Sequence, residues 1–248
     1  MKKILFSDYD GTLYTSSEAI KENKDAIKKF RNSGNILCIT TGRSYKLFLE
    51  AVREHDLEYD YAIINHGTAI LDKDNNIIYE TYFDNELKLD IYSTISQFKL
   101  SNLESLTSVT RLCINSYEYG TTTNNVSKIK VEIPYEQIDL LKIVKEELLN
   151  KYSDLVNIYV HRYITEDEKG NSLEIVPKEV NKLNTINKFL DNYGESLDVY
   201  SIGDSTNDIE MVSIDKGYCI KDSYLDVNNI CLNTVEEVSD LLKKIEES

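Results

Sequence analysis

Two carboxylates lie two positions apart near the start of the chain, in the segment DYDGTL at residues 8–13. The apolar run before them predicts a short strand over residues 3–7, which gives way to a glycine turn. Side chains at positions i and i+2 of a strand point to the same side, so we expect Asp8 and Asp10 to face one ligand. One carboxylate can then act as a nucleophile while the other transfers protons. Taken alone, such a segment is more typical of a solvated turn, so this interpretation depends on motifs further along the chain.

A second acidic segment, GDSTND at residues 203–208, follows an apolar run that predicts a strand over residues 198–202. Ligands of open α/β sheets bind at the carboxyl ends of the strands, and both acidic segments occupy such ends. Carboxylates in the two segments offer the hard oxygen ligands that Mg²⁺ prefers. The sequence therefore predicts a magnesium site. The alternative is that each segment only caps the helix that follows it.

Two further residues fit an anionic ligand at the same sheet edge. Thr41, in TTGR at residues 40–43, follows a predicted strand, and a hydroxyl with backbone N–H groups at such a turn can hold a phosphate oxygen. Lys182 lies just before a predicted helix. A single lysine is normally solvated, so Lys182 matters only if the fold brings it between the carboxylates and the substrate.

The charge of the chain narrows the choice of partner. Its 248 residues carry a formal net charge of −15, which argues against nucleic acid or an anionic membrane as a partner. We expect neither of these and no obligate protein partner. An anionic substrate would need a local source of positive charge, such as a metal ion, a lysine or helix N-termini.

The chain carries no strong targeting or disulfide signal. The first apolar run is too short for a signal peptide and no stretch approaches a membrane span, so we expect a cytoplasmic protein. The cysteines are scattered without a C-x-x-C spacing and are expected to be buried free thiols. They are Cys38, Cys113, Cys219 and Cys231. Neither a zinc site nor a histidine-rich metal site is expected.

The first part of the chain alternates strands and helices, which predicts βαβ units and a mostly parallel sheet. After the first strand, the predicted elements are helices over 18–32 and 44–54, strands over 35–40 and 61–65, and a hairpin of 68–71 with 77–80. The alternation resumes after Pro177. There the predicted helices are 184–192, 208–213 and 235–247, and the predicted strands are 198–202, 217–220 and 230–232.

The middle of the chain has a different order, helix–strand–strand, repeated once. Its predicted helices are 85–99 and 136–151, and its predicted strands are 109–116, 127–133, 156–163 and 172–176. This order indicates an α+β layer in which two helices cover one face of a sheet. We therefore predict an α/β fold with a Rossmann-like parallel sheet over residues 1–82 and 180–248, and an inserted αββαββ domain over 83–179.

In order and context, the four motifs resemble those of the haloacid-dehalogenase (HAD) superfamily of phosphotransferases. DYDGTL is similar to the first motif, Thr41 in TTGR to the second, Lys182 to the third and GDSTND to the fourth. The inserted segment resembles the cap of the Cof-like, type IIB, HAD phosphatases. Two departures stand out: Asn65-His66-Gly67 replaces the frequent Asn-Gly, and Val180-Asn181 precedes Lys182 where a Gly and a Ser are usual. Lys178 is a rival for the third motif.

The resemblance implies a role for each motif residue. Asp8 would be the nucleophile that forms an aspartyl-phosphate, and Asp10 would act first as acid and then as base. Mg²⁺ would be held by the carboxylates of Asp8 and Asp204 and by the backbone carbonyl of Asp10, with Asp208 completing the site directly or through a water. Thr41 and Lys182 would hold phosphate oxygens.

The motifs specify the residues that contact substrate less closely than they specify the catalytic and metal-binding residues. Candidates in the core are Gly42, Arg43, His66 and Asn207. Arg43 either binds substrate or anchors the cap to the core, the second being favoured, and His66 is either a specificity residue or a turn residue with no role. Either Asn65 or His66 faces the substrate. In the cap, the basic candidates for an anionic substrate are Arg111, Lys128, Lys130 and Arg162.

These observations predict a Mg²⁺-dependent phosphatase for a small phosphorylated metabolite, with a sugar phosphate favoured. One alternative is a sugar phosphomutase of the phosphomannomutase type, which would need a second, arginine-rich phosphate site. The cap carries only Arg111 and Arg162, which disfavours that alternative. The other alternative is a non-catalytic sensor of phosphorylated ligands on a HAD scaffold. Such a sensor is expected to lose the nucleophile or the acid, and both Asp8 and Asp10 are present.

Overall fold

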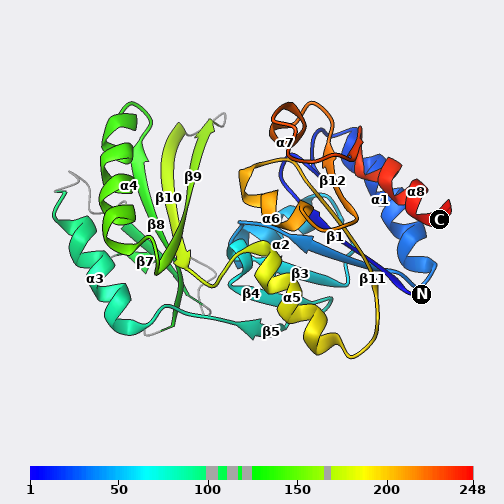
Figure 1. Cartoon of the computed structure of the whole chain (residues 1–248), viewed down its shortest axis with the longest axis horizontal. Coiled ribbons are helices and arrows are strands. Elements are labelled where there is room, and N and C mark those ends of the chain that lie inside the picture. The colour runs from blue at the N-terminus through cyan, green and yellow to red at the C-terminus, as the bar shows by residue number, and fades with distance from the viewer. Residues whose placement is uncertain (99–105, 111–116, 119–124, 165–168, 248) are drawn as a thin grey trace. The chain divides into compact units, whose positions relative to one another are not determined.

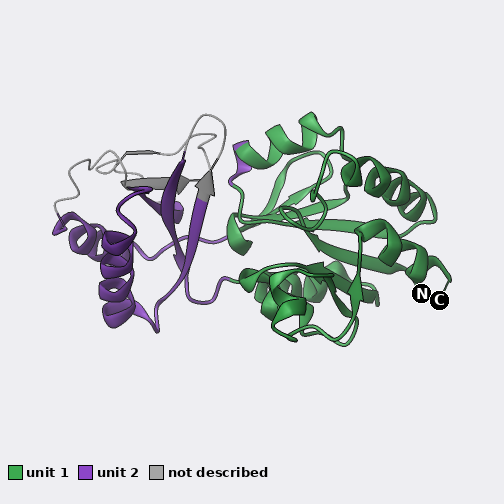
Figure 2. Cartoon of the chain, turned by 90° about the horizontal axis from the view of Figure 1, so that it is seen from above, with its two compact units in different colours: residues 1–43, 47–79, 181–248 green, residues 44–46, 80–180 purple. Residues whose placement is uncertain are grey.

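The computed structural model of the chain describes residues 1–98, 106–110, 117–118, 125–164 and 169–247. The chain forms two compact units, drawn in different colours in Figure 2. We call the first the core unit; it comprises Met1–Arg43, Leu47–Tyr79 and Asn181–Ser248. We call the second the inserted unit; it comprises Ser44–Lys46 and Glu80–Val180.

The core unit is built on an eight-stranded sheet with the order β13-β12-β11-β1-β2-β3-β4-β5. The strands are β1 (Lys3–Asp8), β2 (Ile36–Thr40), β3 (Tyr61–Ile64), β4 (Ala69–Asp72), β5 (Ile77–Glu80), β11 (Asp198–Gly203), β12 (Gly217–Ile220) and β13 (Thr234–Val235). From β13 to β3 every neighbouring pair is parallel, and β4 turns back antiparallel to β3. The predicted α/β fold with a mainly parallel sheet is confirmed.

Helices pack on both faces of this sheet (Figure 1). Helices α1 (Ala19–Asn32) and α8 (Val238–Glu247) contact each other on one face. On the other face, α5 (Lys182–Tyr193) and α6 (Ile209–Val212) join Ile4 and Phe6 of β1 in one apolar cluster. The remaining helical segments are α2 (Tyr45–Glu54), η1 (Asn65–Gly67), η3 (Thr206–Asp208) and α7 (Tyr224–Val227). Because β1 is buried on both faces, it is a near-continuous apolar run, as is typical of a central parallel strand.

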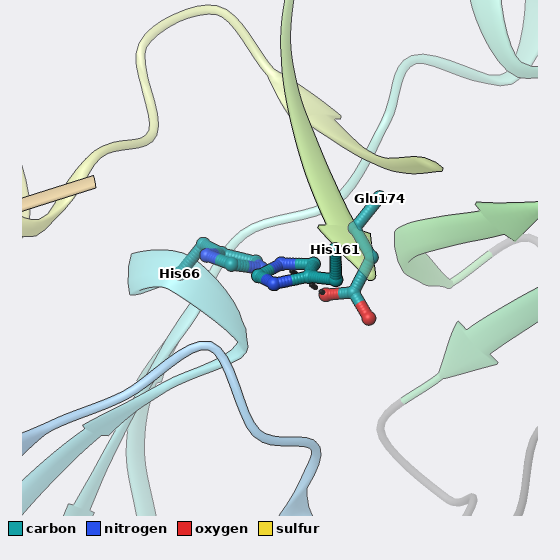
Figure 3. Close-up of side chains that lie close together, drawn as sticks. All are labelled: His66, His161 and Glu174. Atoms are coloured by element: carbon teal, nitrogen blue, oxygen red, sulfur yellow. Dashed lines mark ion pairs between the residues drawn. The ribbon is translucent and has the colours of Figure 1, made fainter. Parts of the chain in front are cut away.

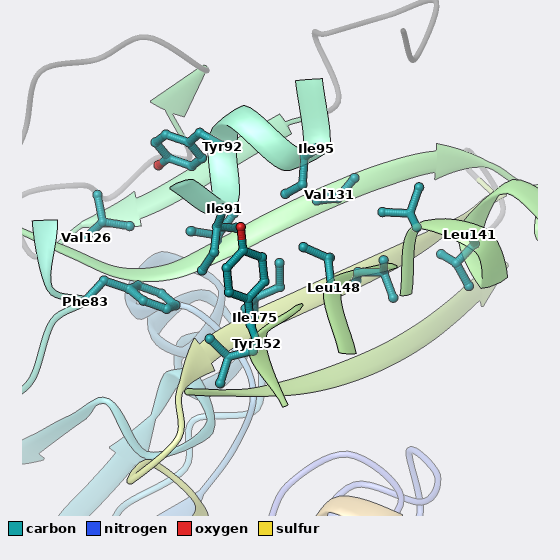
Figure 4. Close-up of a cluster of buried hydrophobic side chains, with 14 of the residues drawn as sticks. Phe83, Ile91, Tyr92, Ile95, Val126, Val131, Leu141, Leu148, Tyr152 and Ile175 are labelled. Atoms are coloured by element: carbon teal, nitrogen blue, oxygen red, sulfur yellow. The ribbon is translucent and has the colours of Figure 1, made fainter. Parts of the chain in front are cut away.

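The inserted unit has its own sheet and its own core (Figure 4). The sheet order is β7-β6-β8-β10-β9, with β6 (Leu106–Thr110), β7 (Tyr117–Glu118), β8 (Val126–Pro134), β9 (Val156–Ile164) and β10 (Lys169–Pro177). Helices α3 (Asn85–Ser96) and α4 (Ile138–Tyr152) supply Ile91 and Leu148 to a buried cluster that also holds Ile129 and Ile175 of the sheet. The expected repeat of helix, strand and strand is recognisable in these elements, with the two-residue β7 added. Residues 111–116, which the sequence assigns to a strand, lie outside the described residues.

The sequence misplaces the last strand. The strand predicted at 230–232 is wrong: β13 forms at Thr234–Val235, where Thr234 pairs with Cys219 and Val235 with Ile220 of β12. Leu232 is 92% exposed, so the apolar run at 230–232 does not mark a buried strand. Because residues 234–235 enter the sheet, α8 begins only at Val238, three residues later than predicted.

Three of the cysteines fall within the described residues. Cys38, Cys219 and Cys231 are buried and free, and Cys113 lies outside the described part. Among the described helices, none combines the length and the apolar character that crossing a membrane would require.

Candidate active site

Three neighbouring strands bring the sequence motifs to one edge of the core sheet. Asp8 ends β1 and pairs in register with Thr40 at the end of β2. On the other side of β1, Ser7 pairs with Ile202 near the end of β11. The residues that follow β2 and β11, Thr41 and Asp204, therefore leave the sheet beside Asp8.

The centre of the site is a buried lysine between two carboxylates. Lys182, the first residue of α5, donates from Nζ to Asp8 Oδ1 and, at 2.5 Å, to Asp208 Oδ1. Asp8, Asp204 and Asp208 each place a carboxylate oxygen so that all lie within 4.8 Å of one another. Lys182 is 2% exposed and Asp208 is completely buried. The rival Lys178 is exposed, so the structure brings Lys182 to the acidic motifs.

Asp204 is held by the loop that follows β1. Thr12 donates from Oγ1 to Asp204 Oδ1 at 2.9 Å. A Cβ at Gly11 would lie 2.5 Å from Asp204 Oδ2, and Gly11 also has a positive φ of 83°. Both the space and the backbone conformation therefore require glycine. Thr12 has a supporting role that the sequence reasoning missed, although it belongs to the DYDGTL segment.

Asp208 is fixed by the start of η3. Its Oδ2 accepts from the backbone N–H of Ser205 at 3.2 Å and of Asp204 at 3.3 Å, while Ser205 caps the 3₁₀ turn in return. This arrangement is a capping box, so the second acidic segment does cap the turn that follows it, as the alternative predicted. The same Asp208 carboxylate also accepts from Lys182, so capping is not its only contact. Asn207 accepts from Ser205 Oγ at 2.6 Å, which orients its side chain within the same turn.

The charges in the cluster are unbalanced. Burial and the neighbouring negative charge of Asp208 raise the pKa of Asp8 well above its usual range, against the opposing effect of Lys182. Burial and Asp208 likewise raise the pKa of Asp204 to about 6. Burial opposes the charge on Lys182, but Asp208 and Asp8 outweigh it, so the pKa of the ammonium group is raised. Three carboxylates face one ammonium group, which leaves an excess of negative charge.

Asp10 is not one of the three clustered carboxylates. Strand β1 ends at Asp8, so Asp10 lies beyond the strand and the alternation of the strand does not determine where its side chain points. Asp10 instead accepts two hydrogen bonds from Arg43, from Nε to Oδ2 at 2.8 Å and from Nη2 to Oδ1 at 2.7 Å. The Asp10 side chain is 52% exposed.

The second motif, TTGR at residues 40–43, is hydrogen-bonded to the turn that follows β3. Thr41 is buried, its Oγ1 accepts from the backbone N–H of Arg43 at 3.1 Å, and its carbonyl accepts from His66 N–H at 3.1 Å. Asn65 and His66 both have positive φ angles, 52° and 59°, and both are buried. The His66 ring packs on Gly42, where a Cβ would lie 2.4 Å from Cε1. Gly42 is therefore a packing requirement for His66.

The basic candidates of the inserted unit are engaged with neighbouring side chains. Lys128 Nζ donates to Glu174 at 2.8 Å, and the pair is largely buried on adjacent strands β8 and β10. Figure 3 shows His161 of β9 beside Glu174, with 3.8 Å between Nε2 and Oε2. Lys130 pairs with Glu132, and Arg162 lies over the Tyr135 ring at 4.0 Å. Arg111 lies outside the described residues.

A family model and several known proteins match this chain. The model for haloacid dehalogenase-like hydrolases covers residues 5–240. A curated relative from Bacillus subtilis, the 5-amino-6-(5-phospho-D-ribitylamino)uracil phosphatase YwtE, is 26% identical over 86% of this chain and 85% of its own length. A haloacid dehalogenase-like hydrolase from Bacteroides thetaiotaomicron aligns with a TM-score of 0.76 at 19% identity, over 99% of this chain and 100% of that one. A structure described as a HAD subclass IIB sugar phosphatase aligns with a TM-score of 0.67 at 18% identity, over 99% of both chains.

The fold is an α/β fold with a mainly parallel sheet, and the carboxyl edge of that sheet carries a cluster of carboxylates around Lys182. The chain belongs to the haloacid dehalogenase-like hydrolases. The resemblance predicted from the four motifs is thereby confirmed, and the predicted enzyme class, a HAD-type phosphatase, is confirmed at the level of the family.

Proposed function

We propose that this protein is a Mg²⁺-dependent phosphatase that hydrolyses a small phosphorylated metabolite through an aspartyl-phosphate on Asp8. The observation that carries the proposal is the buried contact of Lys182 with Asp8 and Asp208, beside Asp204. Burying charged groups is costly unless they are paired, and catalytic sites are where such arrangements recur. The arrangement supplies a nucleophile, a cation for phosphate oxygens and oxygen ligands for a metal.

The donor set fits Mg²⁺. Its three carboxylates offer hard oxygen ligands whose excess negative charge a divalent cation would offset. Asp8 and Asp204 would bind the ion through their carboxylates and Asp10 through its backbone carbonyl, with Asp208 completing the site directly or through a water. When bound, Mg²⁺ would keep Asp8 ionised and reduce its repulsion from the phosphate.

In the first proposed step, the Asp8 carboxylate attacks phosphorus. The bond between phosphorus and the leaving oxygen breaks, and that oxygen takes a proton from Asp10. In the second step, the Asp10 carboxylate takes a proton from water as the water oxygen attacks phosphorus, and the bond to Asp8 breaks. The products are the alcohol and inorganic phosphate, and both aspartates return to their starting forms. Phosphoryl transfer of this kind depends mainly on positioning and charge neutralisation.

Phosphate oxygens would be held by Lys182 and Thr41. Lys182 supplies a charge close to the nucleophile, and Thr41 supplies a hydroxyl at the end of β2. Asn207 and His66 are proposed to contact the substrate. Gly42 acts by leaving room for the His66 ring.

The substrate is proposed to be a small phosphorylated metabolite, with a sugar phosphate favoured. YwtE is named for a phosphoribityl substrate, and the structural neighbour of subclass IIB is described as a sugar phosphatase. Residues 83–179 are proposed to act as the cap that the resemblance implies, which excludes water and selects the substrate.

The test is release of inorganic phosphate from p-nitrophenyl phosphate and from a panel of sugar phosphates, with Mg²⁺ or with EDTA. We expect release to require Mg²⁺ and to fall at least 1,000-fold, an order-of-magnitude value, in Asp8→Asn, because the nucleophile is lost. Asp25→Asn is the matched control, since it removes one exposed carboxylate of α1 and should leave release unchanged. Release that survives EDTA or Asp8→Asn would contradict the proposal.

The panel also separates the phosphatase from a phosphomutase. A mutase would return an isomerised sugar phosphate when a sugar bisphosphate is added, whereas a phosphatase yields the free sugar and phosphate. We expect the free sugar. The inserted unit has only two arginines, Arg111 and Arg162, which disfavours the arginine-rich second phosphate site that a mutase needs.

A further inference from the structure

The contact between Arg43 and Asp10 has the geometry of a fork. Two nitrogens of one guanidinium group donate to the two oxygens of one carboxylate, at 2.8 and 2.7 Å. A fork of this kind fixes the plane of the carboxylate as well as its distance, which a single hydrogen bond or a lysine does not do. Asp10 thus has a defined orientation although half of its side chain is exposed.

Arg43 is itself held from several sides. Its backbone N–H donates to Thr41 Oγ1 at 3.1 Å, and its carbonyl accepts from the backbone N–H of Asn65 at 2.9 Å. Its Nη1 donates to the carbonyl of Leu47 at 3.4 Å. These contacts tie the arginine to the ends of β2 and β3 and to the start of α2.

The Tyr9 ring packs against the guanidinium group of Arg43. The Arg43 Cζ lies 4.9 Å from the centre of the Tyr9 ring, within the range of a cation–π contact. Tyr9 is completely buried and stands between Asp8 and Asp10 in sequence. Its ring stacks near Tyr14 and His55, at centroid distances of 6.3 and 6.4 Å. The same short segment therefore carries both carboxylates and the surface on which Arg43 rests.

Stability alone gives little reason for this arrangement. Exposed ion pairs contribute about 0–1 kcal/mol to folding, and the Arg43 and Asp10 side chains are 32% and 52% exposed. A well-anchored fork on a half-exposed carboxylate has a clearer use in orienting that carboxylate. A group that transfers protons must hold its oxygen in line with the reacting atoms, and a displacement of about 1 Å can cost on the order of 100-fold in rate.

We propose that Arg43 is a positioning residue for Asp10, fixing its carboxylate for proton transfer, and is not a substrate ligand. This inference rests on the proposed phosphatase reaction. It assigns Arg43 a role that differs from both sequence expectations, substrate binding and anchoring of the cap.

The experiment compares two substrates that differ in their need for an acid. The phenolate leaving group of phenyl phosphate needs a proton far more than the nitrophenolate of p-nitrophenyl phosphate does. We expect Arg43→Ala to lower kcat for phenyl phosphate by about 10- to 100-fold, with a smaller loss for p-nitrophenyl phosphate, and to leave KM nearly unchanged. Guanidinium ion, added below denaturing concentration, should restore part of kcat. Arg43→Lys should restore little, because an ammonium group cannot form the fork.

A double-mutant cycle tests whether Arg43 acts through Asp10. In the background of Asp10→Asn, Arg43→Ala should cause no further loss, because the group that it positions is already gone. Arg31→Ala is the matched control. Arg31 forms a similar fork with Asp60, at 3.0 and 2.9 Å, outside the site, and its removal should leave the ratio between the two substrates unchanged.

The possible outcomes separate the inference from the proposed function. A rise in KM with kcat unchanged in Arg43→Ala, or losses that add in the double mutant, would overturn the positioning role and leave the phosphatase intact. Wild-type protein without Asp8-dependent phosphate release would overturn the proposed function and this inference with it. Loss confined to kcat, larger for phenyl phosphate and absent in the Asp10→Asn background, would support both.

Discussion

Asp204 has a pKa of about 6 because it is partly buried beside Asp208. In the unfolded chain an aspartate titrates near 4. Between these two values the folded protein binds more protons than the unfolded chain, so its free energy of unfolding falls as pH rises from about 4 to 6. Above pH 6 the full cost of the ionised carboxylate is present, and below pH 4 it is absent.

The first residue-scale prediction is that Asp204→Asn stabilises the metal-free protein at pH 7. The amide retains an oxygen that accepts from the Thr12 hydroxyl. It also removes the charge of the Asp204 carboxylate, and the raised pKa of that group means that its ionised form costs the folded protein about 1–2 kcal/mol after allowance for partial solvent screening. Urea unfolding in EDTA at pH 7 and pH 4 measures the effect. The gain should vanish at pH 4, and with saturating Mg²⁺ the wild type should be the more stable protein.

Asp198→Asn is a suitable control for that prediction. Hydrogen bonding to Lys216 lowers the pKa of Asp198, so the shift has the opposite sign and its amide variant should gain no stability at pH 7. Equal gains for Asp204→Asn at both pH values would contradict the assignment of the effect to the carboxylate charge.

Which residues gather in the site was easier to predict from the sequence than which side chains they pair with. Asp8, Asp204 and Asp208 could be predicted as a group because each follows the end of a parallel strand or the turn next to it. The fork between Asp10 and Arg43 could not be predicted, since 33 positions separate the two residues and no local pattern marks the pairing. The positive φ angles of Asn65 and His66 could not be predicted either. They accompany backbone hydrogen bonds to the carbonyls of Arg43 and Thr41, which are distant in sequence.

The end of β11 shows how an element positions a side chain. Gly203 is its last residue, and a Cβ there would lie 2.5 Å from Asp208 Cβ and 2.6 Å from its Cγ. We predict that Gly203→Ala displaces Asp208 from Lys182, lowers Mg²⁺ affinity by about tenfold or more and costs about 1–3 kcal/mol of stability. Isothermal titration with Mg²⁺ and thermal unfolding measure the two effects.

Gly194→Ala is the matched glycine variant. Gly194 ends α5 with a φ of 82°, and nothing lies within 4 Å of the added methyl group. Its replacement should cost about 1 kcal/mol through the left-handed backbone alone and leave Mg²⁺ affinity unchanged. Similar losses of affinity in both variants would mean that general destabilisation, and not the position of Asp208, controls the site.

Elements were predictable where the apolar pattern was long. The strands around β1 and the amphipathic α4 follow from such patterns, with ends within a few residues of those observed. The apolar run at 230–232 led to a wrong strand prediction, because a run of three apolar residues does not indicate which of them are buried in the core. Cys231 is buried there while Leu232 is exposed, and the pairing with β12 is made by residues 234–235.

At the scale of the whole molecule, the two units have separate apolar cores. Leu148 is completely buried in the core of the inserted unit, and Leu241 of α8 is completely buried in the core unit. We predict that Leu148→Ala, at a cost of about 2–5 kcal/mol, speeds hydrogen exchange in the inserted unit only. Leu241→Ala should do so in the core unit only, because local cooperative units open separately. Mass spectrometry of exchanged peptides measures this, and a uniform increase across the chain in either variant would contradict it.

The position of β1 in the sheet has a consequence for synthesis of the chain. Its neighbour β2 is made shortly after it, whereas its other neighbour, β11, lies beyond the whole inserted unit in sequence. Until the ribosome has released residues 198–203, one side of the apolar β1 is an open edge that can pair with another nascent chain. The insertion therefore prolongs the period in which the new protein is prone to aggregate. Lys182 emerges shortly before that period ends, and Asp204 and Asp208 emerge just after it.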